Sequence, residues 1–205
     1  MQFQHSRIFQ AVETVVNYFL LNLLWLAMCL PLITAYPATA ALFGVARAWS
    51  RDEEPGIIGP FFRHFRENFA LSLLVGIVWT LLGALLLLNV LLASRMADIV
   101  ALPLLAVTGI AGLAYALMSP YIFPVIVNFH ATPLGVFRNA AFLALGQPFL
   151  SLLAAVTLLS VAVITYFAPI TLFCSGVAVA SSLCLLARRA MRRFLPDGMA
   201  SAPDS

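Results

Sequence analysis

The sequence predicts an all-α fold, a polytopic membrane helix bundle of about five transmembrane helices, the first of them broken between Pro31 and Pro37. Apolar residues make up 63% of the 205 residues and charged residues 9%, and the mean hydropathy is +1.03, outside the range of soluble domains. Long charge-free runs occur, whereas the alternating pattern of membrane β-strands is absent from the sequence. We therefore expect an integral membrane protein made of helices.

Four runs without Asp, Glu, Lys or Arg contain the expected spans: residues 14–46, 68–94, 99–137 and 139–187. A span needs roughly 20 apolar residues, so the last run is long enough for two, and Pro169 marks the turn between them. We expect spans near residues 14–43, 68–94, 100–128, 149–168 and 170–187. They form a single membrane domain, residues 1–193, followed by a disordered cytoplasmic tail, residues 194–205.

The arginines predict the orientation. Arg7 and Arg95 fall on one side of five alternating spans, and the other arginines fall on the opposite side. That second group is Arg47, Arg51, Arg63, Arg66, Arg138, Arg188, Arg189, Arg192 and Arg193. The positive-inside rule then predicts a cytoplasmic carboxyl terminus and an outside amino terminus.

The stretch CLPLITAYPATAALFG, residues 29–44, interrupts the first run. Pro31 removes an amide and pushes Leu30 out of the α region, so the first helix should end or kink there. Thr34 can cap a second helix, and Pro37 falls in its first turn, where no amide is needed. Two arrangements fit: a single kinked and tilted helix, which the length of the run favours, or a re-entrant piece that places the amino terminus inside.

Polar groups at this break form a candidate ligand or packing site, consisting of Asn22, Thr34, Tyr36, Pro37 and Thr39. Exposed amides near Ala35 and Tyr36 would offer donors and a positive helix end to a small polar or anionic ligand, as in transporters with discontinuous helices. The alternative, which we favour from the sequence, is a packing kink whose polar groups are satisfied by neighbouring helices.

Two amphipathic segments, PFFRHFRENF at residues 60–69 and ATPLGVFRNAAFLAL at 131–145, precede the second and fourth spans. They supply a candidate partner surface: Phe61, Phe62, Phe65, Arg66, Phe137 and Arg138. The two segments resemble each other. An ancient duplication that pairs spans one and two with spans three and four would produce such a resemblance. Their other interpretation is interfacial anchoring.

Small residues recur at four-residue spacing in two spans, and each set predicts a close helix contact, within the chain or with a partner. The sets are Ser72, Gly76, Thr80 and Ala84 in the second span, and Gly176, Ala180 and Cys184 in the fifth.

Several function classes find no support in the sequence. Glu13 and Asp98 fall at span ends, so the mid-membrane ionisable groups of an ion-driven transporter are missing. The sequence has no nucleophile elbow, HExxH motif, phosphate loop or paired carboxylates, so we expect no catalytic, cofactor or metal site and no enzyme. No basic folded domain accompanies the arginines, so we expect no nucleic-acid partner.

Three segments in order, LNLLWLAMCLPLITAYPATAALFGVARAW, FFRHFRENF, and YIFPVIVNF before FRNAAFLAL, resemble the YesL family of bacterial membrane proteins. Tyr36 and Pro37 depart from the glycine and small residue expected there. The family is largely uncharacterised, and its genes often lie beside genes for sugar-uptake ATP-driven transporters and glycan-degrading enzymes. The resemblance thus implies a multi-pass protein of the bacterial plasma membrane with an accessory role in carbohydrate import, and it supplies no catalytic residues.

Two functions follow as hypotheses. The first is a non-catalytic accessory or regulatory partner of a carbohydrate uptake system, in contact with the lipid bilayer and with a sugar ATP-driven transporter or a sensor kinase. The second is a small-solute transporter or solute-binding membrane protein with its ligand near Thr34, Tyr36 and Thr39. A purely structural role would show neither a partner nor a cavity. The oligomeric state is not readable from the sequence.

Overall fold

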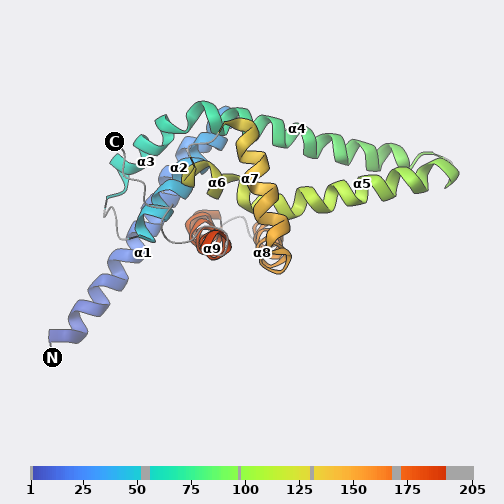
Figure 1. The fold of residues 1–205 in the computed structure, drawn as a ribbon. Helices are drawn as coiled ribbons and strands as arrows, with labels where there is room; N and C mark the ends of the chain where they lie inside the picture. Colours follow the sequence, from blue (N-terminus) through green and yellow to red (C-terminus); the bar gives the residue numbers. More distant parts are fainter. Residues whose placement is uncertain (1, 52–55, 97, 130–131, 168–171, 193–205) are drawn as a thin grey trace.

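Every regular element in the described part of the chain is a helix in the computed structural model (Figure 1). The structure describes residues 2–51, 56–96, 98–129, 132–167 and 172–192, without the side chains of 2–12, 98–100, 172–175 and 188–192. The predicted tail at residues 194–205, the turn at Pro169 and the side chains of the last four arginines lie outside the described residues.

The elements follow one another in an order that repeats. They are α1 (Gln2–Cys29), η1 (Leu32–Thr34), α2 (Ala35–Trp49), α3 (Ile58–Glu67), α4 (Phe69–Ala93), α5 (Asp98–Met118), η2 (Ser119–Tyr121), α6 (Ile122–Asn128), α7 (Pro133–Gly146), α8 (Pro148–Phe167) and α9 (Leu172–Arg192). A long helix, a single 3-10 turn, a shorter helix, a further helix and a long apolar helix occur first as α1 to α4 and again as α5 to α8. The two amphipathic segments contribute α3 and α7, which occupy the same place in the two halves of this order.

Helix α2 forms the centre of the molecule. Ten of its 15 residues are buried, and it contacts α1, α3, α4, α6 and α9. Its sequence AYPATAALFGVARAW is rich in Ala and carries Gly44, so neighbouring helices can approach its backbone closely. At Gly44 an added Cβ would lie 2.6 Å from Cγ of His64 on α3, so a larger residue would push α3 away. The short helix predicted after the break is therefore the core of the fold.

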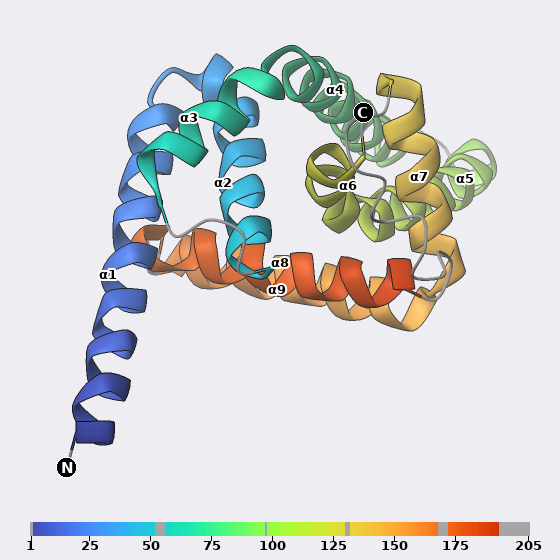
Figure 2. The same ribbon diagram turned by 60° about the vertical axis from the view of Figure 1, so that its left-hand side comes forward.

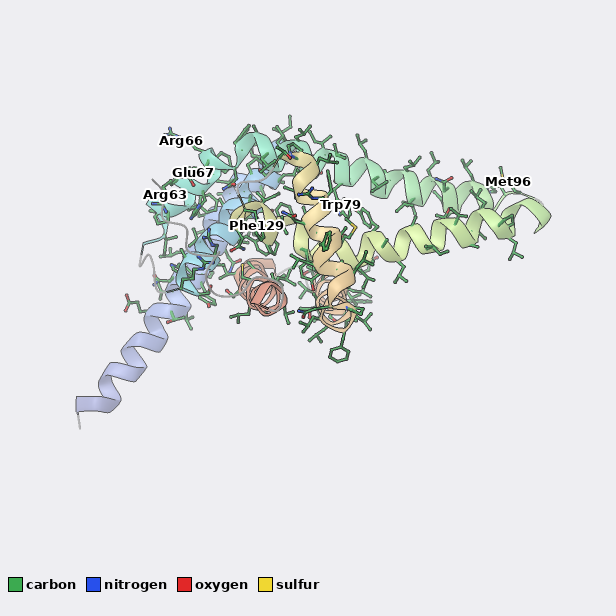
Figure 3. The ribbon with its side chains drawn as sticks, viewed as in Figure 1. Arg63, Arg66, Glu67, Trp79, Met96 and Phe129 are labelled. Carbon is green, nitrogen blue, oxygen red and sulfur yellow. The ribbon has the colours of Figure 1, made fainter. Side chains whose placement is uncertain are left out.

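Within the described parts of the chain, three helices are long and apolar enough to cross a membrane: Phe69–Ala93, Ala101–Asn128 and Pro148–Phe167. The apolar parts of the two other expected spans that the structure describes, Glu13–Cys29 and Gly176–Ala187, are shorter than 18 residues. The α4–α5 hairpin extends away from the other helices, with Met96 near its tip, and only 17% of the apolar window of α4 is buried (Figures 1 and 3). These helices mark a membrane protein.

The count of five spans is not confirmed. Figure 1 looks along α8 and α9 but across α4 and α5, and Figure 2 shows α9 lying crosswise to α1. Helices that cross at such large angles cannot all stand perpendicular to one bilayer. The all-helical class and the apolar helices agree with the sequence prediction, whereas the number of crossings does not follow from this arrangement.

Both sets of small residues make contacts within the chain. On α4, Gly76 faces Tyr36, whose Cδ1 would lie 2.3 Å from an added Cβ. On α9, Gly176 faces Asn22 and Trp25 of α1, and Ala180 and Cys184 are buried in the same core cluster. Close packing within the protein therefore accounts for both sets, except that Ala84 is exposed.

Candidate functional site

At the break between α1 and α2 the chain reverses direction. Pro31 adopts an extended conformation, φ −76° and ψ 113°, so the chain leaves the helix at Leu30 and re-enters it through η1. The ring of Tyr18 stacks on Trp49 at a centroid distance of 5.5 Å, and Trp25 Nε1 donates to Thr39 Oγ1 at 3.2 Å. Earlier residues on α1 thus pair with later residues on α2, which defines an antiparallel hairpin (Figure 2).

This hairpin corrects the arrangement that the length of the run favoured. A single kinked helix would separate Tyr18 and Trp49 by about 46 Å along its axis, at 1.5 Å per residue. The structure instead places their rings in contact. The run is long because it contains two packed helices. Its length alone could not predict this arrangement, because the short helix α2 is stabilised by contacts with its neighbours.

Thr34 lies at the amino end of α2, but its side chain does not cap that helix. Its Oγ1 lies 2.6 Å from the Met28 carbonyl oxygen and 2.7 Å from that of Pro31, so the hydroxyl hydrogen is directed back to the end of α1. The predicted cap is therefore wrong. Thr34 has helical φ and ψ of −86° and −3°, whereas a capping side chain needs an extended backbone.

Backbone groups at the start of α2 are also engaged within the chain. The amide of Ala35 donates to the Leu32 carbonyl, because η1 runs directly into α2. The exposed donor that the sequence predicted near Ala35 is thus used by the preceding turn. Pro37 is buried in the first turn of α2, as predicted.

The two remaining hydroxyls of the predicted site join α2 to other elements. Tyr36 packs over Gly76, and its hydroxyl lies 2.6 Å from Thr80 Oγ1 on α4. Thr39 Oγ1 donates to the Ala35 carbonyl at 2.7 Å while it accepts from Trp25. These contacts tie α2 to α4 and to α1.

Asn22 lies away from these hydroxyls, at the contact between α1 and α9. It is fully buried, donates through Nδ2 to the Tyr18 carbonyl at 2.9 Å, and accepts at Oδ1 from the Val177 amide at 3.1 Å. Gly176 makes this contact possible, because an added Cβ would lie 2.5 Å from Oδ1. The structure therefore brings Tyr36 close to α4 and Thr39 close to Trp25, but it does not gather Asn22 with them.

The candidate partner surface is only partly at the surface. Phe61 is fully buried under α3 and Phe65 is half-buried, while Phe62 is 40% exposed and Arg66 is exposed. Phe61 cannot belong to a partner surface, because a face that anchors α3 to the core is unavailable to a second protein. The sequence identified the amphipathic face correctly but could not tell which phenylalanines fill the core.

Phe137 and Arg138 belong to a separate part of the molecule. Phe137 on α7 is half-buried and stacks on Trp79 of α4 at a centroid distance of 5.7 Å, whereas Arg138 is exposed. In Figure 2, α2 and α6 lie between α3 and α7. The six predicted residues therefore do not form one continuous surface.

The sequence reading missed a second break, at η2. Ser119 Oγ donates to the Tyr115 carbonyl at 2.7 Å and accepts from Trp79 Nε1 at 3.1 Å, and the Tyr121 hydroxyl lies 3.1 Å from Ser151 Oγ on α8. The signal was present in MSPYIFPV, because two prolines four residues apart cannot both leave an α-helical ladder intact. No cluster of three metal-ligating side chains occurs among the described residues.

Comparisons with known proteins agree with the expected family. The model of a family described as a protein of unknown function, DUF624, matches residues 18–90. The uncharacterized protein YesL of Bacillus subtilis (strain 168) is 29% identical over 177 residues, 84% of this chain and 83% of that protein. These matches support membership of the YesL family. The uncharacterized protein YteU of the same organism is 30% identical over 129 residues, 60% of this chain and 57% of that protein.

No solved structure matches this chain. The segment that the family model matches, residues 18–90, begins at Tyr18 in α1 and ends in α4. It contains the whole first break and all the partners of Tyr36 and Thr39 described above.

Proposed function

We propose that this YesL-family chain is a multi-pass protein of the bacterial plasma membrane, without catalytic activity, that serves as an accessory or regulatory partner of a carbohydrate uptake system. The link to carbohydrate uptake rests on the family resemblance described above. Support for a membrane location comes from the three apolar helices. A sugar ATP-driven transporter or a membrane sensor kinase is the partner class that this role requires.

The outer face of α3 is the observation that carries the proposal. Figure 3 shows Arg63, Arg66 and Glu67 on the side of α3 that points away from the other helices. Phe62 lies beside them and meets the buried Phe61 edge-on at 5.8 Å. An aromatic side chain with neighbouring arginines on a firmly anchored helix is a favourable composition for a protein interface.

The ion pair between Arg63 and Glu67 on this face is exposed to solvent. Arg63 Nε and Glu67 Oε1 lie 3.8 Å apart, and both side chains are at least 50% exposed. Exposed pairs of this kind contribute about 0–1 kcal/mol, and the exposed Arg66 adds a further positive charge to the same face. An acidic patch is therefore the complementary surface that we propose for the partner.

The α1–α2 hairpin supports one orientation. Since α2 returns alongside α1, a membrane-inserted hairpin places the amino terminus on the same side as the segment that follows α2, which contains Arg51, Arg63 and Arg66. By the positive-inside rule that side is cytoplasmic. We propose that both termini and α3 face the cytoplasm and that Arg95, near the tip of the α4–α5 hairpin, faces the outside.

A solute site at the break has less support. The side-chain hydroxyls of Thr34, Tyr36 and Thr39 each hydrogen-bond within the chain. A ligand would have to replace these bonds, whereas binding at the α3 face requires none of them to break.

The test is a mild-detergent pull-down of the tagged protein from its native membrane, followed by mass spectrometry. We expect sugar-transporter subunits or a membrane kinase with the wild type, and loss of most of that recovery for the double variant Phe62→Ala/Arg66→Ala. Leu87→Ala/Arg95→Ala, which removes one exposed apolar and one exposed basic residue from the α4–α5 hairpin, is the matched control and should retain the partner. Recovery of the protein alone, or equal recovery with both double variants, would contradict the proposal.

A further inference from the structure

An apolar groove of about 650 Å³ lies between α1 and the start of α3. Its wall on α1 includes Glu13, Asn17, Leu20, Leu24 and Ala27, and Ile58 stands on the α3 side. The spacing of four, three, four and three residues places all five α1 positions on one face of that helix. This α1–α3 groove is separate from the outer face of α3 and from the hydroxyls of the break.

The groove has one polar end and one apolar end. Glu13 and Asn17 occupy the amino end of the described part of α1, and from Leu20 onward the α1 wall is apolar. Beyond Ala27 the chain continues into the turn of the hairpin, where Leu30 and Leu32 are 84% and 87% exposed. A turn that exposes leucines in this way fits hydrocarbon rather than water, so the apolar end of the groove opens toward the middle of a membrane.

The length of the groove matches one leaflet. Glu13 and Ala27 are 14 residues apart, which is about 21 Å of helix. A bilayer with its headgroups is about 40–45 Å thick, so one leaflet measures about 20–22 Å. The volume also lies within the range of roughly 300–1,000 Å³ that holds a small ligand. One phospholipid would therefore place its headgroup at Glu13 and Asn17 and an acyl chain along Leu20 and Leu24.

Charge decides the headgroup. Glu13 is exposed, and it is the one ionisable side chain among the described residues that line the groove. A carboxylate at headgroup depth attracts an ammonium group and repels an anionic headgroup, while the Asn17 side-chain amide can donate to a phosphate oxygen. We propose that the α1–α3 groove binds one phospholipid with a primary-amine headgroup, of the phosphatidylethanolamine type.

Native mass spectrometry of the full chain tests this proposal. The purified protein is exchanged into detergent micelles that contain equal amounts of palmitoyl-oleoyl phosphatidylethanolamine and phosphatidylglycerol, and the lipids retained are counted. We expect one retained lipid, with the amine lipid preferred about fivefold, which corresponds to about 1 kcal/mol for one exposed ion pair. Glu13→Gln should lower the ratio of retained amine lipid to retained phosphatidylglycerol to about one, while one lipid is still retained.

Two further variants separate the groove from general lipid adhesion. Leu20→Trp fills the groove and should reduce retention of both lipids at least threefold. Leu85→Trp, at a 54% exposed position on α4, is the matched control and should change the retention of neither lipid. Helix content by circular dichroism confirms that each variant is folded.

Three results would overturn the proposal: equal retention of the two lipids by the wild type, an unchanged preference in Glu13→Gln, or unchanged retention in folded Leu20→Trp. A dimer mass that Leu20→Trp abolishes, without bound lipid, would assign the groove to a second copy of the chain instead. These results do not depend on the α3 face, so they do not bear on the proposed partner function.

Discussion

The two breaks in this molecule have opposite effects on the direction of the chain. At the first, α2 turns back along α1 and packs against it. At the second, α5, η2 and α6 continue as part of one helical stretch, Ala101–Asn128. Both breaks contain two prolines, Pro31 with Pro37 and Pro120 with Pro124, so proline content does not explain the difference.

The backbone next to each 3-10 turn explains it. Before η1, Pro31 has ψ 113°, an extended value that takes the chain out of the helix. Before η2, Met118 has φ −81° and ψ −31°, so the helix tightens into a 3-10 turn without leaving the helical region. One residue in the extended region thus distinguishes a reversal from a local tightening of the helix.

The two breaks share the way in which their freed polar groups are satisfied. A hydroxyl inside each 3-10 turn bonds back to a carbonyl of the preceding helix, Thr34 to Met28 and Ser119 to Tyr115. A tyrosine at or just after each turn meets a hydroxyl on a long apolar helix, Thr80 in one case and Ser151 in the other. The direction of the chain after each break and the hydrogen bonding of the freed polar groups are therefore set by different residues.

The largest effect is expected where the first break packs on α4. Gly76→Val places side-chain atoms where the Tyr36 ring lies, since even a Cβ would be 2.3 Å from Cδ1. Overpacking of this kind costs about 1–3 kcal/mol or more, and we expect a loss of at least ~2 kcal/mol in the free energy of unfolding. The measurement is reversible unfolding in mixed detergent micelles followed by circular dichroism.

Gly109→Val on α5 is the matched control for Gly76→Val. An added Cβ at Gly109 meets no atom within 4 Å, so this variant should change stability by less than about 0.5 kcal/mol. Equal losses in the two variants would show that the contact of Tyr36 with Gly76 does not hold the first break in place.

Sequence reasoning located the first break correctly but not its direction. Pro31 predicts an interruption through the loss of one amide, whereas the reversal depends on its ψ angle and on the contacts of Trp25 and Trp49, which are distant in sequence. The four-residue spacing around Gly76 predicted a close contact but not its partner, Tyr36. Periodicity likewise put Phe61 and Phe62 on one face without telling that one is fully buried.

A smaller effect is expected from the hydroxyl that satisfies the end of α1. Thr34→Val removes the donor near the Met28 and Pro31 carbonyls, and an unsatisfied carbonyl in an apolar setting costs about 1–2 kcal/mol of unfolding free energy. Thr34→Ser keeps the hydroxyl and should therefore retain most of the wild-type free energy of unfolding. Thr157→Val is the control, because the Thr157 hydroxyl bonds to the carbonyl four residues earlier in an intact helix and its loss should cost less than about 0.5 kcal/mol. Equal losses for Thr34→Val and Thr157→Val would remove the role given to Thr34.

The smallest expected effect distinguishes the two tyrosine contacts. The oxygens of Tyr36 and Thr80 are 2.6 Å apart, a short hydrogen bond, whereas those of Tyr121 and Ser151 are 3.1 Å apart. Ser151 also lies within bonding distance of the Ala144 and Gln147 carbonyls, at 2.9 and 3.0 Å. Double-mutant cycles with Phe for Tyr and Ala for Thr80 or Ser151 should give a coupling energy of about 1 kcal/mol at the first break and less than about 0.5 kcal/mol at the second. The reverse order would contradict this comparison.

The reversal at the first break is tested most directly by crosslinking across the hairpin. The variant Tyr18→Cys/Trp49→Cys, in a chain whose three native cysteines are replaced by alanine, is treated in native membranes with a short thiol crosslinker. The stacked rings at 5.5 Å predict efficient crosslinking, seen as a shift in gel mobility after proteolysis between the two sites. Tyr18→Cys/Arg95→Cys, with one cysteine near the tip of the α4–α5 hairpin, is the control and should remain uncrosslinked. If both pairs fail to crosslink while the single cysteines react with a monofunctional thiol reagent, α1 and α2 do not form a hairpin.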